Sequence, residues 1–155
     1  MEKIETVSII SQYSRILLGM KKVRFRKGKY NGFGGGLENG ESPLESAIRE
    51  TREEVGITMV NPTRMGEILF QFPTEEPDHR VHFFKAFRYK GSPTESDEMK
   101  PMWFSINNIP YDQMWSNDKY WLPLLLMGKF FTGRFQFDEN HGVAEYELNE
   151  VTRLD

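Results

Sequence analysis

The sequence contains no cysteine and no long hydrophobic run. Without cysteine, the chain can form neither a disulfide framework nor a thiolate metal site. Its apolar runs all fall short of the roughly 20 residues that a transmembrane helix needs, so we expect no membrane partner. The first ten residues show neither a signal-peptide pattern nor the composition of a transit peptide. These absences favour an intracellular, cytoplasmic protein, with a nuclear or mitochondrial fraction as an alternative.

An excess of basic charge is also missing. The chain has 20 Lys and Arg against 23 Asp and Glu, which gives a net charge of −3. A domain that binds a nucleic acid polymer is usually basic, so we expect no such partner. A small anionic substrate is compatible with this charge if metal ions and a local basic patch bind its phosphates.

The length of 155 residues suits a single domain spanning 1–155, which we expect to be a monomer. Alternating apolar residues predict strands, the last two forming an antiparallel pair, at 6–10, 15–20, 67–72, 81–89, 102–104, 130–137 and 143–148. Helical patterns predict helices at 43–55 and 120–127, with Pro123 in the first turn of the second. The sum is an α+β fold, an α/β/α sandwich in which a mixed β-sheet carries helices on its faces.

The most informative stretch runs over 23 residues from Gly35 to Ile57. Ser42 can cap the start of its helix, and the spacing from Ser42 to Glu45 is that of a capping box. Pro43 is tolerated at the first helical position, and Gly56 can end the helix in the left-handed conformation. The stripe that should face the core consists of Leu44, Ala47, Ile48, Thr51 and Val55.

Three acidic residues of this helix, Glu50, Glu53 and Glu54, are spaced so that they share one face. Arg49 can relieve the repulsion at Glu53, four residues later. The usual explanation of such a run is a solvated acidic face. A glycine-rich turn and Glu41 just before the helix favour another explanation, because clustered oxygen ligands beside an irregular backbone suit a hard divalent cation such as Mg²⁺.

Two stretches before the helix bear on phosphate binding. Residues 21–29 carry six positive charges in nine positions and form a solvated loop or a rim that attracts a triphosphate. Nucleic acid binding is a weaker third option, because one short run on an acidic protein is a small electrostatic footprint. The glycines of 30–36 permit close approach of the backbone to a ligand. No Gly-Lys-Ser/Thr follows them, so this is not a P-loop. Three histidines lack the spacing of a metal site, and we expect structural or surface roles for His79, His82 and His141.

The stretch from Gly35 to Ile57 resembles the signature of the Nudix hydrolases, which cleave nucleoside diphosphates linked to a further group. The matching positions are Gly35, Glu41, Arg49, Glu50, Glu53, Glu54, Gly56 and Ile57. Thr51 departs from the family pattern, which usually has an aliphatic residue there. The resemblance implies the Nudix fold and a hydrolase that depends on Mg²⁺, with Mn²⁺ as a substitute.

From about Thr6 to Val151 the chain is similar to one branch of that family, the animal-type oxidised purine nucleoside triphosphate hydrolases. The similarity is carried by residues 17–22, 31–35, 95–99, 114–115 and 120–126 and by the pair Phe70 and Phe72. It implies hydrolysis of 8-oxo-dGTP, 2-hydroxy-dATP and related damaged nucleotides to the monophosphate and pyrophosphate, which removes them from the nucleotide pool.

The resemblance also implies a role for each matching residue. The metal ligands would be Glu50, Glu53 and Glu54, with a backbone carbonyl of Gly34 or Gly35. Glu98 would join them from its loop, either as a further metal ligand or as the catalytic base. Arg49 would orient the acids, Glu41 would support the helix start, and Lys21 would lie near the sugar or phosphates. The base pocket would be built from Thr6, Phe25, Asn31, Phe70, Phe72, Trp115, Asn117 and Asp118. Its aromatic rings would cover the purine face, and its amides and carboxyl its polar edge.

Two positions depart from the branch. Gly36 stands where the branch has a lysine, and Asn117 stands where it has the first of two adjacent aspartates. An amide cannot titrate, and it removes the like-charge neighbour that would hold a proton on Asp118. Our hypothesis is therefore an ionised Asp118 and a narrower or shifted base preference.

Two alternatives stay open. The first is a Nudix enzyme for another substrate, such as an ordinary dNTP, ADP-ribose or a dinucleotide, and Asn117 keeps it open. The second is a nucleotide-binding module without catalysis. The intact glutamate set argues against the second, because a pure binder has no use for clustered carboxylates.

Overall fold

The computed structural model describes residues 2–24 and 27–155. Its elements in chain order are β1 (Glu2–Gln12), β2 (Arg15–Lys21), β3 (Tyr30–Asn31), α1 (Pro43–Val55), β4 (Thr58–Val60), β5 (Thr63–Gln71), β6 (Asp78–Ala86), β7 (Arg88–Lys90), β8 (Met99–Ser105), the 3₁₀ turn η1 (Tyr111–Gln113), α2 (Asp118–Leu126), β9 (Phe130–Phe137) and β10 (Val143–Val151). Over these described ranges, neither helix is long and apolar enough to cross a membrane.

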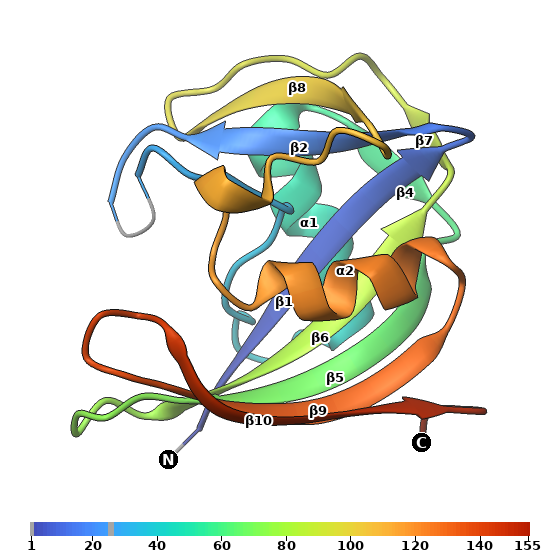
Figure 1. The fold of residues 1–155 in the computed structure, drawn as a ribbon. Helices are drawn as coiled ribbons and strands as arrows, with labels where there is room; N and C mark the ends of the chain where they lie inside the picture. The colour runs from blue at the N-terminus through green and yellow to red at the C-terminus, as the bar shows by residue number, and fades with distance from the viewer. Residues whose placement is uncertain (1, 25–26) are drawn as a thin grey trace.

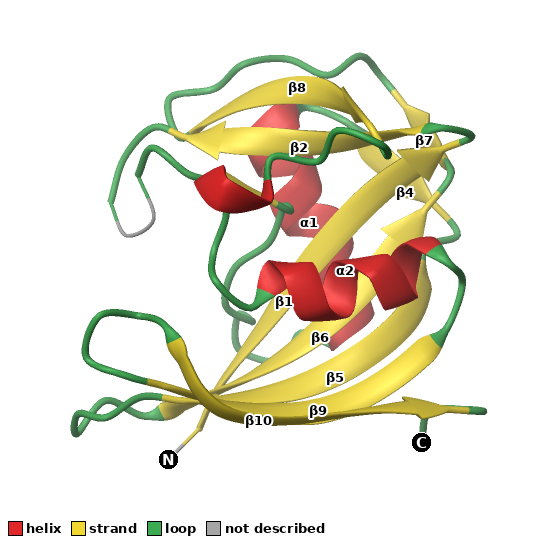
Figure 2. Ribbon diagram, viewed as in Figure 1, coloured by secondary structure: helices red, strands yellow, loops and turns green. Residues whose placement is uncertain are grey.

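The main sheet has eight strands and is mixed (Figure 2). Its order is β10-β9-β5-β6-β1-β2-β3, and β8 also pairs with β2. The pairs β1/β6 and β5/β9 are parallel, whereas β9 and β10 form the antiparallel pair that the sequence predicts. Strands β4 and β7 form a separate two-stranded sheet. The prediction of a mixed sheet is thus confirmed.

The two helices cover opposite faces of the sheet, with α2 in front of it and α1 behind it in Figure 1. Successive residues of β1 serve the two cores, since successive side chains of a strand point to opposite faces. Ile9 belongs to the buried cluster that includes Trp121 of α2, and Ile10 belongs to the one that includes Ala47 and Val55 of α1. This alternation makes the predicted α/β/α sandwich.

Helix α1 begins and ends where its sequence predicts. The Glu45 backbone N–H donates to Ser42 Oγ at 3.1 Å, and the Ser42 N–H donates to Glu45 Oε1 at 3.0 Å, which completes the capping box. Gly56 adopts a left-handed φ of 74°, and its N–H donates to the Arg52 carbonyl at 2.9 Å. The buried Thr51 hydroxyl donates to the Ala47 carbonyl at 2.8 Å, so this departure from the family pattern leaves no unpaired polar atom.

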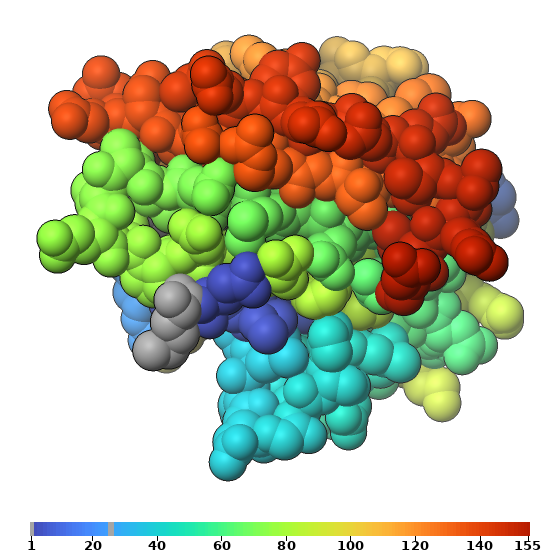
Figure 3. Space-filling model, turned by 90° about the horizontal axis from the view of Figure 1, so that it is seen from below, coloured from blue at the N-terminus to red at the C-terminus, as the bar shows by residue number. Residues whose placement is uncertain are grey.

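Three local predictions are wrong. The stretch 81–89, predicted as one strand, is divided at Phe87 between β6 of the main sheet and β7 of the two-stranded sheet. Leu44 is 44% exposed, because the first turn of α1 projects from the molecule, as the cyan segment at the lower edge of Figure 3 shows. Helix α2 begins at Asp118, so Pro123 lies inside the helix. Pro123 has no N–H to donate to the carbonyl of Lys119, four residues earlier, and Lys119 is an exposed residue.

Replacement of the α1 cap tests this account of the helix. We expect Ser42→Ala to lower the free energy of unfolding by about 1 kcal/mol, because an N–H at the start of the helix loses its acceptor. Urea denaturation measures the change. Ser92→Ala, in an exposed loop, is the control and should leave the midpoint unchanged. Equal midpoints for both variants and the parent would contradict the role of the cap.

Candidate active site

The site begins with residues 32–36, here called the glycine loop, which lie against strand β1. The Thr6 N–H donates to the Gly35 carbonyl at 2.9 Å, and Ser8 and Phe33 exchange backbone hydrogen bonds of 2.6 and 3.0 Å. A Cβ on Gly34 would stand 1.7 Å from the Thr6 carbonyl oxygen, so no other residue fits there. The absence of a side chain at Gly34 therefore allows the loop to approach the strand closely.

This contact brings a backbone donor to the acidic face of α1. The Gly34 N–H donates to Glu54 Oε1 at 2.8 Å, and Glu54 is only 3% exposed. Burial raises the pKa of Glu54 to about 8, against the opposing effects of the Gly34 N–H and of Lys21, while Glu50 raises it further. Burial also raises the pKa of Glu50, although Arg49 partly offsets this. Two of the three helix acids thus face inward rather than forming a solvated face.

Arg49 organises the other acids. Its Nε and Nη2 donate to the two oxygens of Glu41 at 2.6 and 3.0 Å, and these bonds, with one from the Glu38 N–H, lower the pKa of Glu41 to about 2. Its Nη1 reaches Glu50 at 3.1 Å and Glu53 at 3.2 Å. The guanidinium therefore joins the start of α1 to two of the predicted metal ligands.

Glu98 approaches the same acids from the loop before β8. Its charge contributes to the raised pKa values of Glu50 and Glu54, and its Oε1 accepts a hydrogen bond from Arg24 Nη1 at 2.9 Å. The basic run thus packs on the acidic loop rather than standing free. Phe25, which the sequence assigns to the base pocket, lies outside the described residues.

These oxygen donors fit a hard divalent cation. Glu50 and Glu54 are crowded, partly desolvated carboxylates beside the glycine loop, and the Glu50 carboxyl lies about 3 Å from where a Cβ of Gly35 would stand. Over the described part of the chain, no three carboxylates or histidines converge into a closed metal cage. Such an open set suits Mg²⁺, which is usually bound by one or two carboxylates together with substrate phosphates.

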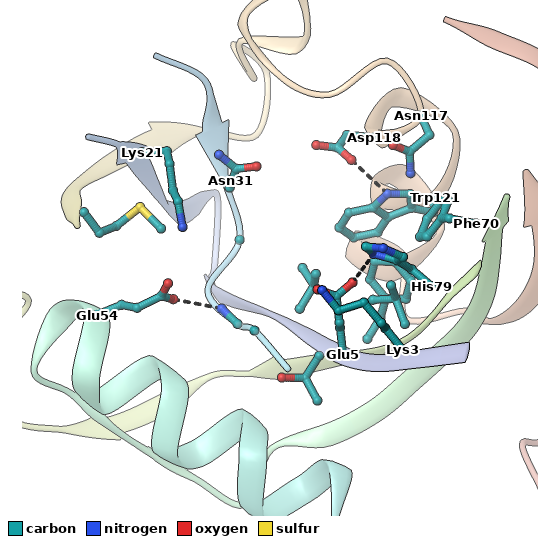
Figure 4. Close-up of a pocket in the computed structure, with 18 of the residues that line it drawn as sticks. Lys3, Glu5, Lys21, Asn31, Glu54, Phe70, His79, Asn117, Asp118 and Trp121 are labelled. Atoms are coloured by element: carbon teal, nitrogen blue, oxygen red, sulfur yellow. Dashed lines mark hydrogen bonds and ion pairs between the residues drawn. The ribbon is translucent and has the colours of Figure 1, made fainter. Parts of the chain in front are cut away.

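A cleft of about 320 Å³ runs from this acidic end toward α2. Six residues that the sequence assigns to substrate binding line it, namely Thr6, Lys21, Asn31, Phe70, Asn117 and Asp118. Gly34, Gly35 and Glu54 line it as well. Figure 4 shows Glu54 and Lys21 on one side of the cleft and Asp118, Trp121 and Phe70 on the other. The acidic helix and the predicted base pocket therefore belong to one site.

Several buried polar atoms in the cleft have no hydrogen-bond partner among the described residues. These atoms are Thr6 Oγ1, Asn31 Oδ1 and Asn117 Oδ1. Buried polar atoms rarely remain unpaired, because the lost hydration costs about 1–3 kcal/mol each. Asp118, next to Asn117 and across the cleft from Asn31 in Figure 4, accepts a hydrogen bond at Oδ1 from Trp121 Nε1 at 3.1 Å. The cleft therefore offers acceptor oxygens from two sides to a ligand that carries N–H groups.

Some aromatic residues of the pocket differ from the expected set. Phe72 and Trp115 do not line the cleft; each packs against Phe137, with ring centroids 5.4 and 5.8 Å apart. The structure places Trp121 in the lining instead. Its spacing from Asp118, three residues on a helix, was the available signal, because that spacing puts both side chains on one face.

Other lining residues carried no such signal. Lys3, Glu5 and His79 also line the cleft, and they come from the adjacent strands β1 and β6. Nothing local in the sequence brings these strands together, so their side chains could not be assigned to the site.

Comparison with known proteins decides the family. The model of the NUDIX domain matches residues 4–125, which include the glycine loop, α1 and most of the cleft. The chain belongs to the Nudix family. As a Nudix hydrolase it is an enzyme that acts on small nucleotide substrates, and this family generally needs a divalent metal ion.

Its relatives cover nearly its whole length. The chain is 45% identical to the oxidized purine nucleoside triphosphate hydrolase of Danio rerio, over 98% of this chain and 97% of that one. It is 41% identical to the protein of the same name from Mus musculus, over 96% of both chains. Among solved structures, the Mutator MutT protein of Bacillus halodurans superposes with a TM-score of 0.86 at 28% identity and covers 95% of this chain and 97% of its own.

The buried Glu54 predicts a pH-dependent stability. Its pKa in the folded chain, about 8, lies above the ordinary value of 4.5, so the folded protein holds a proton that the unfolded chain releases. This contribution is fully present below about pH 4.5 and is lost as the pH rises through about 8. In EDTA at pH 8, the free energy of unfolding of Glu54→Gln should therefore exceed that of the parent by at least about 1 kcal/mol. At pH 4.5 the two free energies of unfolding should be equal.

Urea denaturation at a series of pH values measures this difference. Glu75→Gln, in the exposed loop between β5 and β6, is the matched control and should follow the parent at every pH. A constant difference between Glu54→Gln and the parent across the series would contradict the burial of an ionisable group.

Proposed function

We propose that this Nudix enzyme hydrolyses oxidised purine nucleoside triphosphates, among them 8-oxo-dGTP and 2-hydroxy-dATP, to the monophosphate and pyrophosphate. We further propose that the metal is Mg²⁺ and that the protein works as a cytoplasmic monomer on free nucleotides. The observation that carries the proposal is a single cleft with an aromatic, acceptor-rich end and an acidic end bordered by cations. The names of the Danio rerio and Mus musculus relatives support the same substrate class.

The aromatic end suits a damaged purine. Phe70 and Trp121 offer apolar surface to the faces of a ring, and Asn31 and Asn117 offer buried oxygens to its edge. Oxidation of guanine at C8 turns N7 from an acceptor into an N–H donor. A pocket rich in acceptor oxygens therefore gains a hydrogen bond with the oxidised base that ordinary guanine cannot supply.

The acidic end suits a triphosphate. Lys21 and Arg24 line the cleft there and can pair with phosphate oxygens. Glu50 and Glu54 would hold the metal, with Arg49 fixing the orientation of Glu50. When bound, the metal supplies charge neutralisation on the phosphates and lowers the pKa of a water molecule. The protein's own part is to place the phosphates over these carboxylates.

A second candidate is a Nudix hydrolase of another nucleotide, and one observation favours it. Asn117 presents an amide where the resemblance leads us to expect a carboxyl, and its Oδ1 is buried in the cleft without a described partner. An amide offers one fixed donor and one fixed acceptor, whereas a carboxyl can change its role by protonation. The set of accepted bases is therefore narrower or shifted in this chain.

Hydrolysis of a small panel tests the proposed activity. We expect an oxidised purine, 8-oxo-dGTP or 2-hydroxy-dATP, to be hydrolysed faster than dGTP or ADP-ribose, and only when Mg²⁺ is present. Chromatography should resolve the monophosphate and pyrophosphate. Glu54→Gln should lower kcat by about 100-fold or more while nucleotide binding persists, because the variant loses a charge at the reacting end.

Glu75→Gln again serves as the matched control and should keep the parent's kcat. Faster hydrolysis of dGTP or ADP-ribose would contradict the proposed substrate class but would agree with the hydrolase activity of the family. No turnover of any nucleotide would instead support a binding module.

Asn117 predicts a change in base preference. Asn117→Asp creates two adjacent carboxyls, of which one can hold a proton near neutral pH. We expect this variant to accept a wider set of oxidised purines and to show a new titration step in the pH profile of kcat/KM. Steady-state kinetics with 8-oxo-dGTP and 2-hydroxy-dATP between pH 6 and 9 provide the measurement. An unchanged substrate ranking together with an unchanged pH profile would disprove the hypothesis.

A further inference from the structure

His79 occupies the cleft although the sequence indicates only a structural or surface role. It lies on β6, next to β1, where its neighbour in register is Lys3. Its Nδ1 lies 2.6 Å from Glu5 Oε1, and its ring and that of Phe72 form a T-shaped pair with centroids 5.0 Å apart. Both His79 and Glu5 line the cleft (Figure 4). The imidazole is therefore held in place at a ligand-facing position.

Strand β6 carries two histidines, His79 and His82, whose side chains lie on opposite faces of the sheet. His79, Val81 and Phe83 line the cleft, since alternate residues of a strand share one face. His82 lies on the opposite face, where its Nδ1 is 3.6 Å from Glu67 Oε1. The chain thus offers a matched pair of histidines, one inside the site and one outside it.

The bond to Glu5 fixes the chemistry of the ring. An ionised carboxylate can only accept, so the hydrogen of a neutral imidazole resides on Nδ1. In this neutral form Nε2 is an acceptor, the ring atom that can meet a donor group of a ligand. A neutral His79 therefore adds a directional acceptor to the oxygens of Asn31 and Asn117.

The position of His79 along the cleft indicates which part of a ligand it meets. Figure 4 shows it at the end formed by Phe70, Trp121 and Asp118, away from Glu54. The acidic end of the cleft suits the phosphates and the metal ion, so the nucleoside would lie at the aromatic end. A side chain at the aromatic end, such as His79, would therefore contact the nucleoside.

We propose that His79, positioned by Glu5, is a specificity-determining residue that hydrogen-bonds the nucleoside part of the substrate. Glu5 acts through His79 by fixing its ring and the nitrogen that carries hydrogen. This inference rests on the proposed function, because it assigns the purine to the aromatic end of the cleft. By this proposal, side chains of β1 and β6 contribute to nucleoside recognition together with Asn31 and the residues of α2.

Binding of a metal-free product isolates the contribution of His79. Isothermal titration with 8-oxo-dGMP in EDTA should show that His79→Leu binds about three- to tenfold more weakly than the parent, the loss expected for one hydrogen bond. In the hydrolysis assay, KM for 8-oxo-dGTP should rise by a similar factor while kcat stays within about twofold. His79→Phe keeps a ring against Phe72 without a hydrogen bond, and it should show the same loss. His82→Leu, on the opposite face, should match the parent.

The role of Glu5 is tested by rescue. Glu5→Leu should weaken 8-oxo-dGMP binding to the same extent as His79→Leu, and the double variant should be no weaker than either single one. Glu5→Gln should bind like the parent, because its amide oxygen can still accept from Nδ1. A merely structural role for Glu5 would not produce this pattern.

Two failures can be told apart. If the parent binds 8-oxo-dGMP and both His79 variants bind it equally well, His79 does not determine specificity and the proposal is overturned, while the proposed function stands. If the parent binds no oxidised purine nucleotide, the proposed function falls and this inference falls with it.

Discussion

The seating of the glycine loop on strand β1 is the contact on which the rest of the site depends. Gly34 approaches Thr6 so closely that a single added carbon would collide with its carbonyl oxygen. This approach presents the Gly34 N–H to Glu54 and brings Asn31 to the cleft beside the side chains of β1. One backbone contact thus aligns the acidic end of the site with its aromatic end.

Charge is distributed along the cleft in a way that matches a nucleotide. Arg49 balances the acids at the start of α1, whereas the buried Glu54 has the Gly34 N–H and the more distant Lys21 as its stabilising neighbours. A carboxylate in this setting is destabilised until a cation approaches it. At the other end, amide oxygens and aromatic rings lie with the carboxyls of Asp118 and Glu5, and these groups can discriminate between bases. The site therefore separates reaction from recognition within a single cleft.

Local features of the fold were predictable from the sequence, and contacts between distant segments were not. The caps of α1 depend on Ser42, Glu45 and Gly56, which lie within one helix, and each has the predicted conformation. The fixed spacing of the signature likewise identified the family. In contrast, the burial of Glu54 depends on the packing of the glycine loop, and the pairing of His79 with Glu5 depends on the parallel register of β1 and β6. The periodicity of the sequence predicts neither contact, because each joins segments that are far apart in the chain.

A crystal structure of the complex with 8-oxo-dGMP tests most directly the claim that one cleft binds the whole nucleotide. The account predicts the base at the aromatic end, with its edge within hydrogen-bond distance of the side chains of Asn31 and Asn117. The phosphate should point toward Lys21 and Glu54. A base bound at the acidic end, or a nucleotide bound outside the cleft, would contradict the account.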